Sequence, residues 1–371
     1  MNVPLLDLVA QYRAIKDEVL PAMMAVIEAQ QFIMGGQVAQ LEVEVAKVSH
    51  AKFGIGCASG TDALLLPLKA LQLEPGDEVI TTPFTFFATA GAIHNAGGTP
   101  VFVDIDPGTF NIDAQAVAAA LTPRTRAIIP VHLYGQMADM ERLLQLAQKR
   151  HIPVIEDAAQ AIGARRKIDG EWRLAGELGW VTGYSFFPSK NLGAWGDGGM
   201  MVTSDAATAE RLRKLRLHGG AKQYHHEEVG TNSRLDTLQA AVLLAKLPHL
   251  AAWSAARRDN AAYYTQGLAG VAGVRTPATD AANEHIFHQY TLRVERRDQL
   301  QARFKEQGIG SAVYYPIPLH RQECFAHLGY KAGSLPHSER AAAEAISLPI
   351  YPELTHGQLD YVIETIRGFY A

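Results

Sequence analysis

The amino-acid sequence predicts an α/β fold, in which helices cover both faces of a mainly parallel sheet and a smaller α+β domain follows. Two observations support this prediction. Between about residues 53 and 203, short runs rich in β-branched residues alternate with helix-like stretches, a rhythm typical of chains built from β–α–β units. One of these runs, residues 127–131, is apolar throughout, as expected for a strand that is buried on both faces.

The individual elements follow from the same alternation. We expect strands at residues 53–57, 78–81, 99–104, 127–131, 153–156, 181–186 and 199–203. The helix-like stretches between them are residues 62–71, 85–95, 114–121 and 140–150. Two helices are expected before the sheet and two after it, at residues 11–29, 37–49, 233–247 and 251–268.

The C-terminal part of the chain has a different pattern. It mixes strand-like residues 289–294 and 312–315 with helix-like residues 297–307 and 356–369. We therefore predict a large domain over residues 1–250, which includes the N-terminal helices, and a small α+β domain over residues 251–371.

Charge and composition argue against nucleic-acid-binding, membrane and disulfide-rich classes of protein. The 371 residues carry a formal net charge of −4, which gives no reason to expect nucleic acid or an anionic membrane as a partner. No apolar run approaches the roughly 20 residues needed to span a bilayer, and the first residues lack the pattern of a signal peptide. Cys57 and Cys324 are too few for a disulfide framework. We therefore expect a cytoplasmic protein.

Lys190 is the first candidate for chemistry. It ends the run from Ser185 to Lys190, of sequence Ser-Phe-Phe-Pro-Ser-Lys, and glycine-rich residues 196–199 follow it. Small, aromatic and polar neighbours can lower the pKa of a lysine, and a neutral amine is a nucleophile toward an aldehyde. The alternative for Lys190, taken alone, is a surface lysine in a turn.

The second candidate is an acidic pair at the end of a strand. Glu156 and Asp157 follow an apolar run, and ligands of open α/β sheets bind at the carboxyl ends of the strands. Asp157 is suited to pair with a pyridine nitrogen and keep it protonated, which makes the ring an electron sink. The alternative is an aspartate that caps the next helix.

A third candidate is a turn of small residues. Ser59, Gly60 and Thr61 precede a predicted helix, whose free N–H groups and positive end suit a phosphate. Any capped helix start can look similar. Beyond another strand end, Phe86 is one of three phenylalanines in residues 82–89 and is suited to stack on a flat ring. The alternative for these phenylalanines is core packing.

The order of these motifs resembles the DegT–StrS family of sugar aminotransferases. The motifs are Ser-Gly-Thr at 59–61, Phe-Thr-Phe at 84–86, Glu-Asp-Ala-Ala-Gln at 156–160, Ser-Phe-Phe-Pro-Ser-Lys at 185–190, Gly-Asp-Gly-Gly at 196–199 and Gly-Thr-Asn-Ser-Arg-Leu-Asp at 230–236. The likeness runs from Leu5 to Pro349. It implies an aminotransferase of fold type I that depends on pyridoxal 5′-phosphate (PLP), and a homodimer whose active sites are shared between subunits.

The resemblance also implies roles for individual residues. Lys190 would bind PLP covalently and then move a proton between cofactor and substrate carbons. Asp157 would pair with the pyridine nitrogen, and Gln160 would contact the ring hydroxyl. The other cofactor-binding residues would be Gly60, Thr61 and Ser185 at the phosphate, Phe86 over the ring, and Asn232 from the neighbouring subunit. L-Glutamate would be the donor, pyridoxamine 5′-phosphate (PMP) the intermediate cofactor form, and ping-pong kinetics the signature.

The acceptor is implied to be a nucleotide-linked keto sugar. The stretch from residue 224 to residue 241 is most similar to family members that aminate C3, above all those acting on UDP-2-acetamido-2-deoxy-3-oxo-glucuronate in O-antigen (lipopolysaccharide) biosynthesis. Arg234 suits a uronate carboxylate because its planar fork binds two oxygens, although relatives that handle neutral sugars share the motif. Tyr315 and His320 are further candidates for contact with sugar or diphosphate. Tyr314 stands where a histidine would fit that subgroup better.

Other functions stay open as alternatives. The acceptor could be a dTDP-3-keto-6-deoxyhexose or a 4-keto nucleotide sugar. A regulator that keeps the fold without catalysis would not need all four of Asp157, Lys190, Thr61 and Asn232. A sugar dehydratase on this scaffold would carry a histidine in place of Lys190. His225 and His226 have no third ligand at a suitable spacing, so no metal site is predicted. The charged residues 165–173 are expected to form a solvated hairpin.

Overall fold

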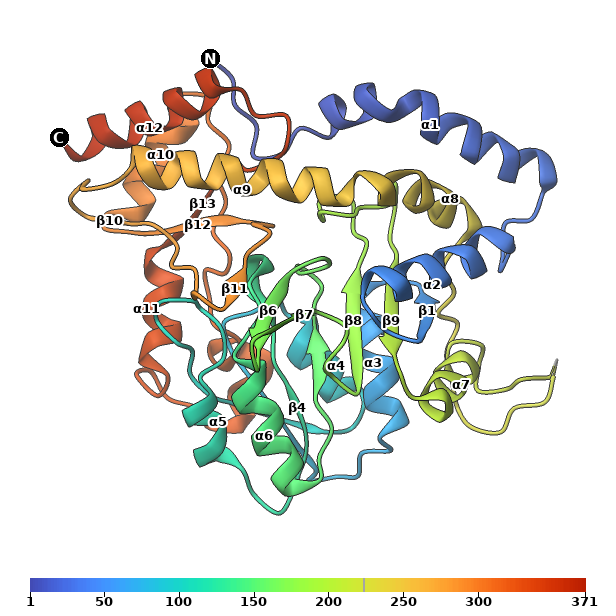
Figure 1. Ribbon diagram of the computed structural model, residues 1–371. Helices are drawn as coiled ribbons and strands as arrows, with labels where there is room; N and C mark the ends of the chain where they lie inside the picture. Colours follow the sequence, from blue (N-terminus) through green and yellow to red (C-terminus); the bar gives the residue numbers. More distant parts are fainter. Residues whose placement is uncertain (223) are drawn as a thin grey trace.

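The computed structural model describes residues 1–222 and 224–371, and its centre is a mainly parallel sheet (Figure 1). A four-stranded part in the order β1-β9-β8-β5 meets a three-stranded part in the order β3-β2-β4. Parallel bridges from Ile128 to Val154 and from Val131 to Asp157 join the two parts. The strands are β1 (Phe53–Cys57), β2 (Glu78–Thr81), β3 (Thr99–Phe102), β4 (Thr125–Ile129), β5 (Ile155–Asp157), β8 (Val181–Ser185) and β9 (Gly199–Thr203).

The strands predicted for the central sheet are confirmed, with ends that differ by up to two residues, and so is the predicted fold class. In the central sheet, β9 runs antiparallel to both of its neighbours, and the other pairs are parallel. The strands β2, β8 and β9 are buried along nearly their whole length, which explains their continuous apolar character. Parallel neighbours deliver their carboxyl ends to one edge of the sheet, and that edge positions the residues described below.

Helices cover the sheet. They are α2 (Gly36–Val48), α3 (Gly60–Ala70), α4 (Ala88–Asn95), α5 (Ala114–Ala120), α6 (Met140–Arg150) and α7 (Ala206–Leu215). The prediction of a helix over residues 85–95 was wrong at its start. The helix begins only at Ala88, because Thr85 and Phe86 form a loop in which the Thr85 and Thr89 hydroxyls meet at 3.0 Å. The sequence reading missed α7, which begins at the Asp205 cap.

Three further helices pack together above the sheet in Figure 1. They are α1 (Leu8–Ala29), α8 (Thr237–Lys246) and α9 (Leu250–Gly267), with the short 3₁₀ helix η2 (Leu247–His249) between the last two. Ile15 and Val19 of α1 are buried against Val242 of α8. The predicted helix over residues 233–247 begins later, at Thr237, since the preceding residues form an extended segment beside the sheet edge.

The C-terminal residues form a second, antiparallel sheet. Its strands are β10 (Val274–Arg275), β12 (Tyr290–Val294) and β13 (Ala345–Leu348), and its helices are α10 (Arg297–Glu306), α11 (Pro336–Glu344) and α12 (His356–Tyr370). Their core contains Tyr264 of α9 and also Val3 from the N-terminus. We propose the division near residue 250, at the junction of η2 and α9, with Val3 returning to the C-terminal part.

Residues 312–315 were wrongly predicted as a strand. Ala312 alone pairs, through a bridge to Ser347. The next residues leave the sheet, since Pro316 and Pro318 have no N–H to donate to a ladder, and the 3₁₀ helices η3 (Leu319–Arg321) and η4 (Glu323–Leu328) follow. Tyr314 and Tyr315 pack instead against a cluster that contains Phe84.

The charged residues 165–173 do form a hairpin, as predicted, but it is not solvated throughout, because Arg166 is buried and pairs with Asp139 and Asp280. Its strands β6 (Arg165–Ile168) and β7 (Glu171–Leu174) are joined by Asp169 and Gly170, both with positive φ, and β11 (Asn283–Glu284) pairs with β6. The short 3₁₀ helix η1 (Leu133–Gly135) completes the elements. Within residues 1–222 and 224–371, no helix is long and apolar enough to cross a bilayer.

Candidate active site

The turn predicted to hold a phosphate lies beside the end of β8. Strand pairing brings Cys57 of β1 and Ser185 of β8 to the same residue of β9, Gly199. A Cβ on Gly60 would lie 2.5 Å from the Ser185 Cβ, so this close approach requires glycine. Ser59 caps α3 by accepting the Asp62 N–H at 3.1 Å, and Thr61 is exposed at the mouth of the turn. Gly60, Thr61 and Ser185 thus come together.

Asp157 lies at the carboxyl end of β5 and is buried. Its Oδ2 accepts a hydrogen bond from the Thr89 hydroxyl at 2.7 Å, and its Oδ1 accepts one from the Ala159 N–H at 3.2 Å. Burial raises the pKa of the Asp157 carboxyl, while these two hydrogen bonds and the charge on Lys190 oppose that rise. The orientation of the carboxylate is therefore fixed, and the carboxylate lies close enough to Lys190 for the two charges to interact.

Lys190 projects from the loop after β8. Its N–H donates to the Phe187 carbonyl at 2.9 Å, and its side chain is half-buried. Burial lowers the pKa of the Lys190 amine to about 8, and the Asp157 carboxylate works in the opposite direction. With such a pKa about a tenth of the amine is neutral at pH 7, far more than for an ordinary lysine, and the neutral form attacks an aldehyde.

Gln160 connects two tyrosines at the edge of this group. Its Oε1 accepts the Tyr134 N–H at 2.6 Å, and its Nε2 donates to the Tyr315 hydroxyl oxygen at 3.1 Å. Burial raises the pKa of Tyr315, and the nearby Asp157 charge adds to the rise. Tyr315, predicted as a sugar contact, therefore lies next to the residues predicted to hold the cofactor. The Tyr134 hydroxyl donates to the Tyr314 carbonyl.

The three phenylalanines of residues 82–89 have clearly different environments. Phe84 is buried and stacks on Phe110, and Phe87 stacks on Phe325, both with ring centroids 5.7 Å apart. Phe86 is 59 % exposed, and its ring is tilted at 44° to that of Tyr315, 6.3 Å away. Phe86 is thus the phenylalanine that remains available to cover a flat ring.

The segment with Asn232 and Arg234 lies against the phosphate turn. Ser233 accepts the Ala58 N–H at 3.2 Å and donates to the Asp62 carboxylate at 2.8 Å. Asn232 forms a bridge with Leu217, and its side chain is exposed. Arg234 is half-buried, and none of the ion pairs or side-chain hydrogen bonds among the described residues involves its guanidinium.

His320 has a different setting. It is buried in η3, its Nε2 lies 3.1 Å from the Glu339 carboxylate, and its ring meets that of Tyr330 edge-on. These contacts lie beside β3 and α11, and they give His320 partners of its own. A role for His320 toward the sugar stays a prediction.

Sequence reasoning missed the polar residues that support Asp157. Thr89 is one, and a second is the buried pair of His132 and Glu156. His132 Nδ1 accepts the Ala138 N–H at 3.2 Å, so its proton is on Nε2 and is donated to Glu156 at 2.7 Å. The backbone N–H of His132 also donates to the backbone carbonyl of Asp157. Thr89 and Glu156 each had a sequence signal, since Thr89 lies in the polar and aromatic run that contains Phe86 and Glu156 precedes Asp157 in the acidic pair. His132 had no such signal.

The donor set fits PLP. Among the residues described, no cluster of three or more metal-ligating side chains occurs. A phosphate suits the N-terminus of α3 at Gly60, which a Cβ would fill. An aldehyde suits the Lys190 amine, and a protonated pyridine nitrogen suits the Asp157 carboxylate, which Thr89 already orients.

Comparisons with known proteins agree with this chemistry. Residues 13–367 match the DegT/DnrJ/EryC1/StrS aminotransferase family. A "pleiotropic regulatory protein" of Geobacillus stearothermophilus is 55 % identical over 100 % of this chain and 99 % of its own. A UDP-N-acetyl-3-dehydro-α-D-glucosamine 3-aminotransferase of Acidithiobacillus ferrooxidans is 47 % identical over 98 % and 97 %. A UDP-2-acetamido-2-deoxy-3-oxo-D-glucuronate aminotransferase of Pseudomonas aeruginosa is 45 % identical over 99 % and 100 %.

Solved structures extend the likeness to the cofactor. Streptomyces venezuelae DesV, in complex with a ketimine intermediate, superposes with a TM-score of 0.96 at 42 % identity, covering 100 % of this chain and 98 % of DesV. Bacillus subtilis NtdA with bound PMP has a TM-score of 0.90 at 33 % identity, covering 98 % and 84 %. The protein is accordingly a PLP-dependent sugar aminotransferase. The chain belongs to the DegT/DnrJ/EryC1/StrS aminotransferase family.

Proposed function

We propose that this enzyme transfers an amino group from L-glutamate to the C3 keto group of UDP-2-acetamido-2-deoxy-3-oxo-glucuronate. The reaction takes place in the cytoplasm, in the synthesis of a surface polysaccharide such as O-antigen. The observation that supports a uronate substrate concerns Arg234. Its guanidinium has no carboxylate partner among the described residues, although the neighbouring Ser233 holds this segment against the phosphate turn. A guanidinium left without an internal partner is suited to a substrate carboxylate.

The residues of the site have separate tasks in this reaction. When bound, PLP supplies an electron sink that stabilises negative charge on the carbon next to the amino nitrogen. Asp157 keeps the pyridine nitrogen protonated, and Thr89 holds the carboxylate in the required direction. Lys190 binds the cofactor aldehyde, gives way to the substrate amine, and then moves a proton between the substrate carbon and the cofactor. Gly60, Thr61 and Ser185 hold the phosphate, while Gln160 contacts the ring hydroxyl and Phe86 covers the ring.

The proposal includes a homodimer that shares its active sites. Asn232 is exposed, which leaves its amide free to reach a phosphate bound by the neighbouring subunit. Exposed apolar side chains support such an interface, namely Phe187 in the Lys190 loop and Phe32, Ile33 and Met34, of which Ile33 bridges to Asp236. A monomer would then lack a complete phosphate site.

A second candidate substrate is favoured by one comparison. The A. ferrooxidans relative is named for an uncharged sugar, UDP-N-acetyl-3-dehydro-α-D-glucosamine. That sugar and the proposed uronate differ at C6, which carries a hydroxymethyl group in one and a carboxylate in the other. Under this candidate Arg234 would have a structural role.

The reverse half-reaction distinguishes the two sugars. We expect the PLP form to be converted rapidly to the PMP form by UDP-2-acetamido-3-amino-2,3-dideoxy-glucuronate, followed by absorbance. The 3-amino derivative of UDP-N-acetylglucosamine and a dTDP-3-amino-6-deoxyhexose should react far more slowly. Faster conversion by either neutral sugar would refute the uronate and keep the aminotransferase.

Arg234→Ala tests the same point from the protein side. Because a hydrogen-bonded charge pair is lost with the uronate alone, we expect a roughly ten- to hundredfold loss of half-reaction efficiency on that sugar and little change on the neutral one. Equal losses on both sugars would return Arg234 to a structural role.

The G. stearothermophilus relative is named as a regulatory protein, and a test of the donor half-reaction separates that role from amine transfer. A protein that only regulates has no need for Lys190 and Asp157 together. Conversion of the bound cofactor by L-glutamate, with release of 2-oxoglutarate, would establish the donor half-reaction. Visible absorbance that glutamate leaves unchanged would favour the regulator.

A further inference from the structure

A buried histidine contacts the residue that follows Lys190. His288 lies just before β12, and its Nδ1 is 3.2 Å from the Asn191 Oδ1. The Asn191 Nδ2 in turn donates to the Ile286 carbonyl at 3.3 Å. Asn191 and His288 are separated by 97 positions in the sequence, so this contact ties the Lys190 loop to a distant part of the chain.

The hydrogen-bond partners determine which nitrogen of His288 carries the proton. A backbone carbonyl can only accept, so Ile286 requires the amide nitrogen of Asn191 on its side. The Asn191 oxygen then faces His288, and an oxygen also only accepts. His288 Nδ1 must therefore be protonated and donate to Asn191.

His288 is itself held firmly and without charge. The buried Arg257 guanidinium donates to the Ile350 carbonyl at 2.6 Å and to the Phe287 carbonyl at 3.2 Å, next to His288 in the chain. Burial, together with the nearby Lys190 and Arg257 charges and His285, keeps the pKa of His288 well below its usual value. A neutral imidazole adds no positive charge beside Lys190, and its Nδ1–H remains a fixed donor.

A second contact holds the far end of the same loop. The Lys246 ammonium of α8 is buried and donates to the Gly193 carbonyl at 2.8 Å. The loop from Lys190 to Gly193 is thus fixed at Asn191 from one side and at Gly193 from the other. Asn191 directly follows Lys190, whereas Gly193 lies three residues after it. We therefore expect the contact at Asn191 to have the greater effect on the position of the Lys190 amine.

We propose that His288 is a positioning residue for Lys190: its Nδ1–H holds Asn191, and with it the loop that places the Lys190 amine beside Asp157. This inference rests on the proposed role of Lys190 as the lysine that binds PLP. His288 acts through Asn191 and has no task at the reacting atoms.

Three substitutions of His288 separate the two ring nitrogens. In His288→Asn the side-chain amide nitrogen can occupy the position of Nδ1, whereas in His288→Gln it reaches the position of Nε2. His288→Leu removes both. Two quantities are measured: the rate at which apoprotein takes up PLP covalently, followed by visible absorbance, and the glutamate half-reaction, resolved into its limiting rate and its half-saturating concentration.

We expect His288→Asn to stay within a few-fold of the native protein in both rates. His288→Gln and His288→Leu should lose roughly ten- to a hundredfold in PLP uptake and in the limiting rate, since misplacing a reacting group by about 1 Å can cost that much. The half-saturating glutamate concentration should change little. Retention by His288→Gln, equal losses in the Asn and Gln variants, or native rates in all three would each overturn the proposal.

His285 supplies a matched control. It is also buried, and its Nδ1 accepts the Phe287 N–H at 2.9 Å, whereas none of the hydrogen bonds of its ring among the described residues reaches Asn191 or Gly193. The same three substitutions at His285 should leave both rates near native, even where they lower the melting temperature. If the rates fell as much as they do in the His288 variants, the effect would be one of general packing, and the proposal would be overturned. If His288→Leu does not fold, the Asn and Gln variants carry the test. Lys190→Ala in the same uptake assay checks the proposed function separately: covalent uptake without Lys190 would refute the role of Lys190.

Discussion

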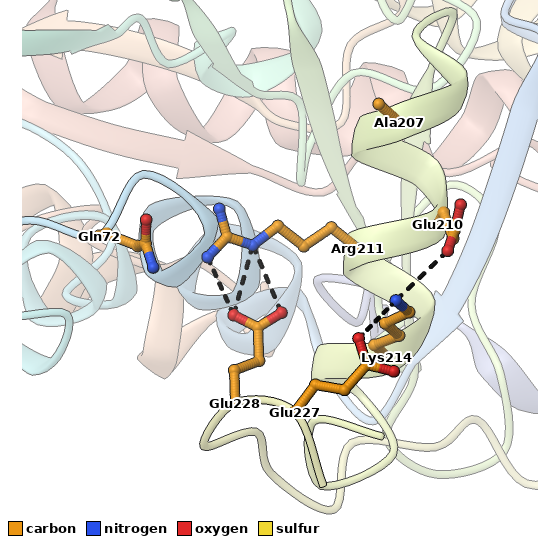
Figure 2. Close-up of a pocket in the computed structure, with 7 residues that line it drawn as sticks. All are labelled: Gln72, Ala207, Glu210, Arg211, Lys214, Glu227 and Glu228. Atoms are coloured by element: carbon orange, nitrogen blue, oxygen red, sulfur yellow. Dashed lines mark hydrogen bonds and ion pairs between the residues drawn. The ribbon is translucent and has the colours of Figure 1, made fainter. Parts of the chain in front are cut away.

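Two charged regions of this molecule differ in how their lysines are balanced. Between α7 and the following loop lies a surface cavity of about 430 Å³ (Figure 2). Lys214 lies there 3.3 Å from Glu210 and 2.8 Å from Glu227, and Arg211 pairs with Glu228 at 2.9 Å. These partners raise the pKa of Lys214. At the sheet edge, Lys190 forms no ion pair among the described residues, and burial lowers its pKa to about 8.

The difference shows which property identifies a reactive site. Charges that are already paired near the surface gain little by meeting a ligand, however large the cavity beside them. Desolvation alone does not single out Lys190, since burial also lowers the pKa of Lys246 to about 8. A lowered pKa beside a specific charged group, here Asp157, is what points to a functional group. The charges that line the cavity beside α7 are paired with one another, whereas the Lys190 amine has no ion pair among the described residues.

The sharpest way to break the comparison is to remove each lysine in turn. Lys190→Ala should lower turnover by at least about a thousandfold, because the nucleophile and proton carrier are lost together. Bound cofactor should also lose the visible absorbance of a covalent lysine adduct. Lys214→Ala, the matched control, should keep both turnover and absorbance. Similar losses in the two variants would show that Lys190 is no more important for turnover than Lys214, which would contradict the comparison.

Asp157→Asn tests the charge that faces Lys190. An amide at this position cannot keep a pyridine nitrogen protonated, so we expect turnover to fall roughly a hundredfold or more with the fold intact. Steady-state rates together with a melting curve would measure this. Near-normal turnover would contradict the assignment of Asp157 to the pyridine nitrogen.

The pH dependence of cofactor uptake sharpens the contrast further. Since burial lowers the pKa of Lys190 to about 8, its neutral fraction increases with pH and reaches one half near pH 8. Covalent PLP uptake by apoprotein should rise about tenfold from pH 6 to pH 7 and level off above about pH 9. Because the Asp157 carboxylate raises the Lys190 pKa, Asp157→Asn should move the midpoint to lower pH. A midpoint near that of an ordinary lysine would contradict a desolvated amine.

Local signals in the sequence account for what could be predicted. The strands from β1 to β9 of the central sheet are apolar runs bounded by turn residues, and the motifs around Lys190 and Asp157 mark their own positions. The supporting contacts depend on pairing across long stretches of chain: Thr89 meets Asp157 over 68 positions, and His288 meets Asn191 over 97. No local pattern indicates such partners. The wrongly predicted strand at residues 312–315 failed for a related reason, because its tyrosines find their packing near Phe84.

The smallest expected effects come from the hydroxyl chain behind Asp157. The single proton of the Thr89 hydroxyl is donated to the Asp157 carboxylate, so the Thr85 hydroxyl must be the donor in the 3.0 Å contact with Thr89. Thr89→Val keeps the shape and removes one hydrogen bond to a charged group, so we expect turnover to fall about tenfold. Thr85→Val removes only the next bond in the chain and should cost about two- to threefold. Steady-state turnover of both variants measures this order; if Thr85→Val proved as damaging as Thr89→Val, the hydroxyls would act as one packed unit, and the direction of the Asp157 carboxylate would not depend on Thr89 in particular.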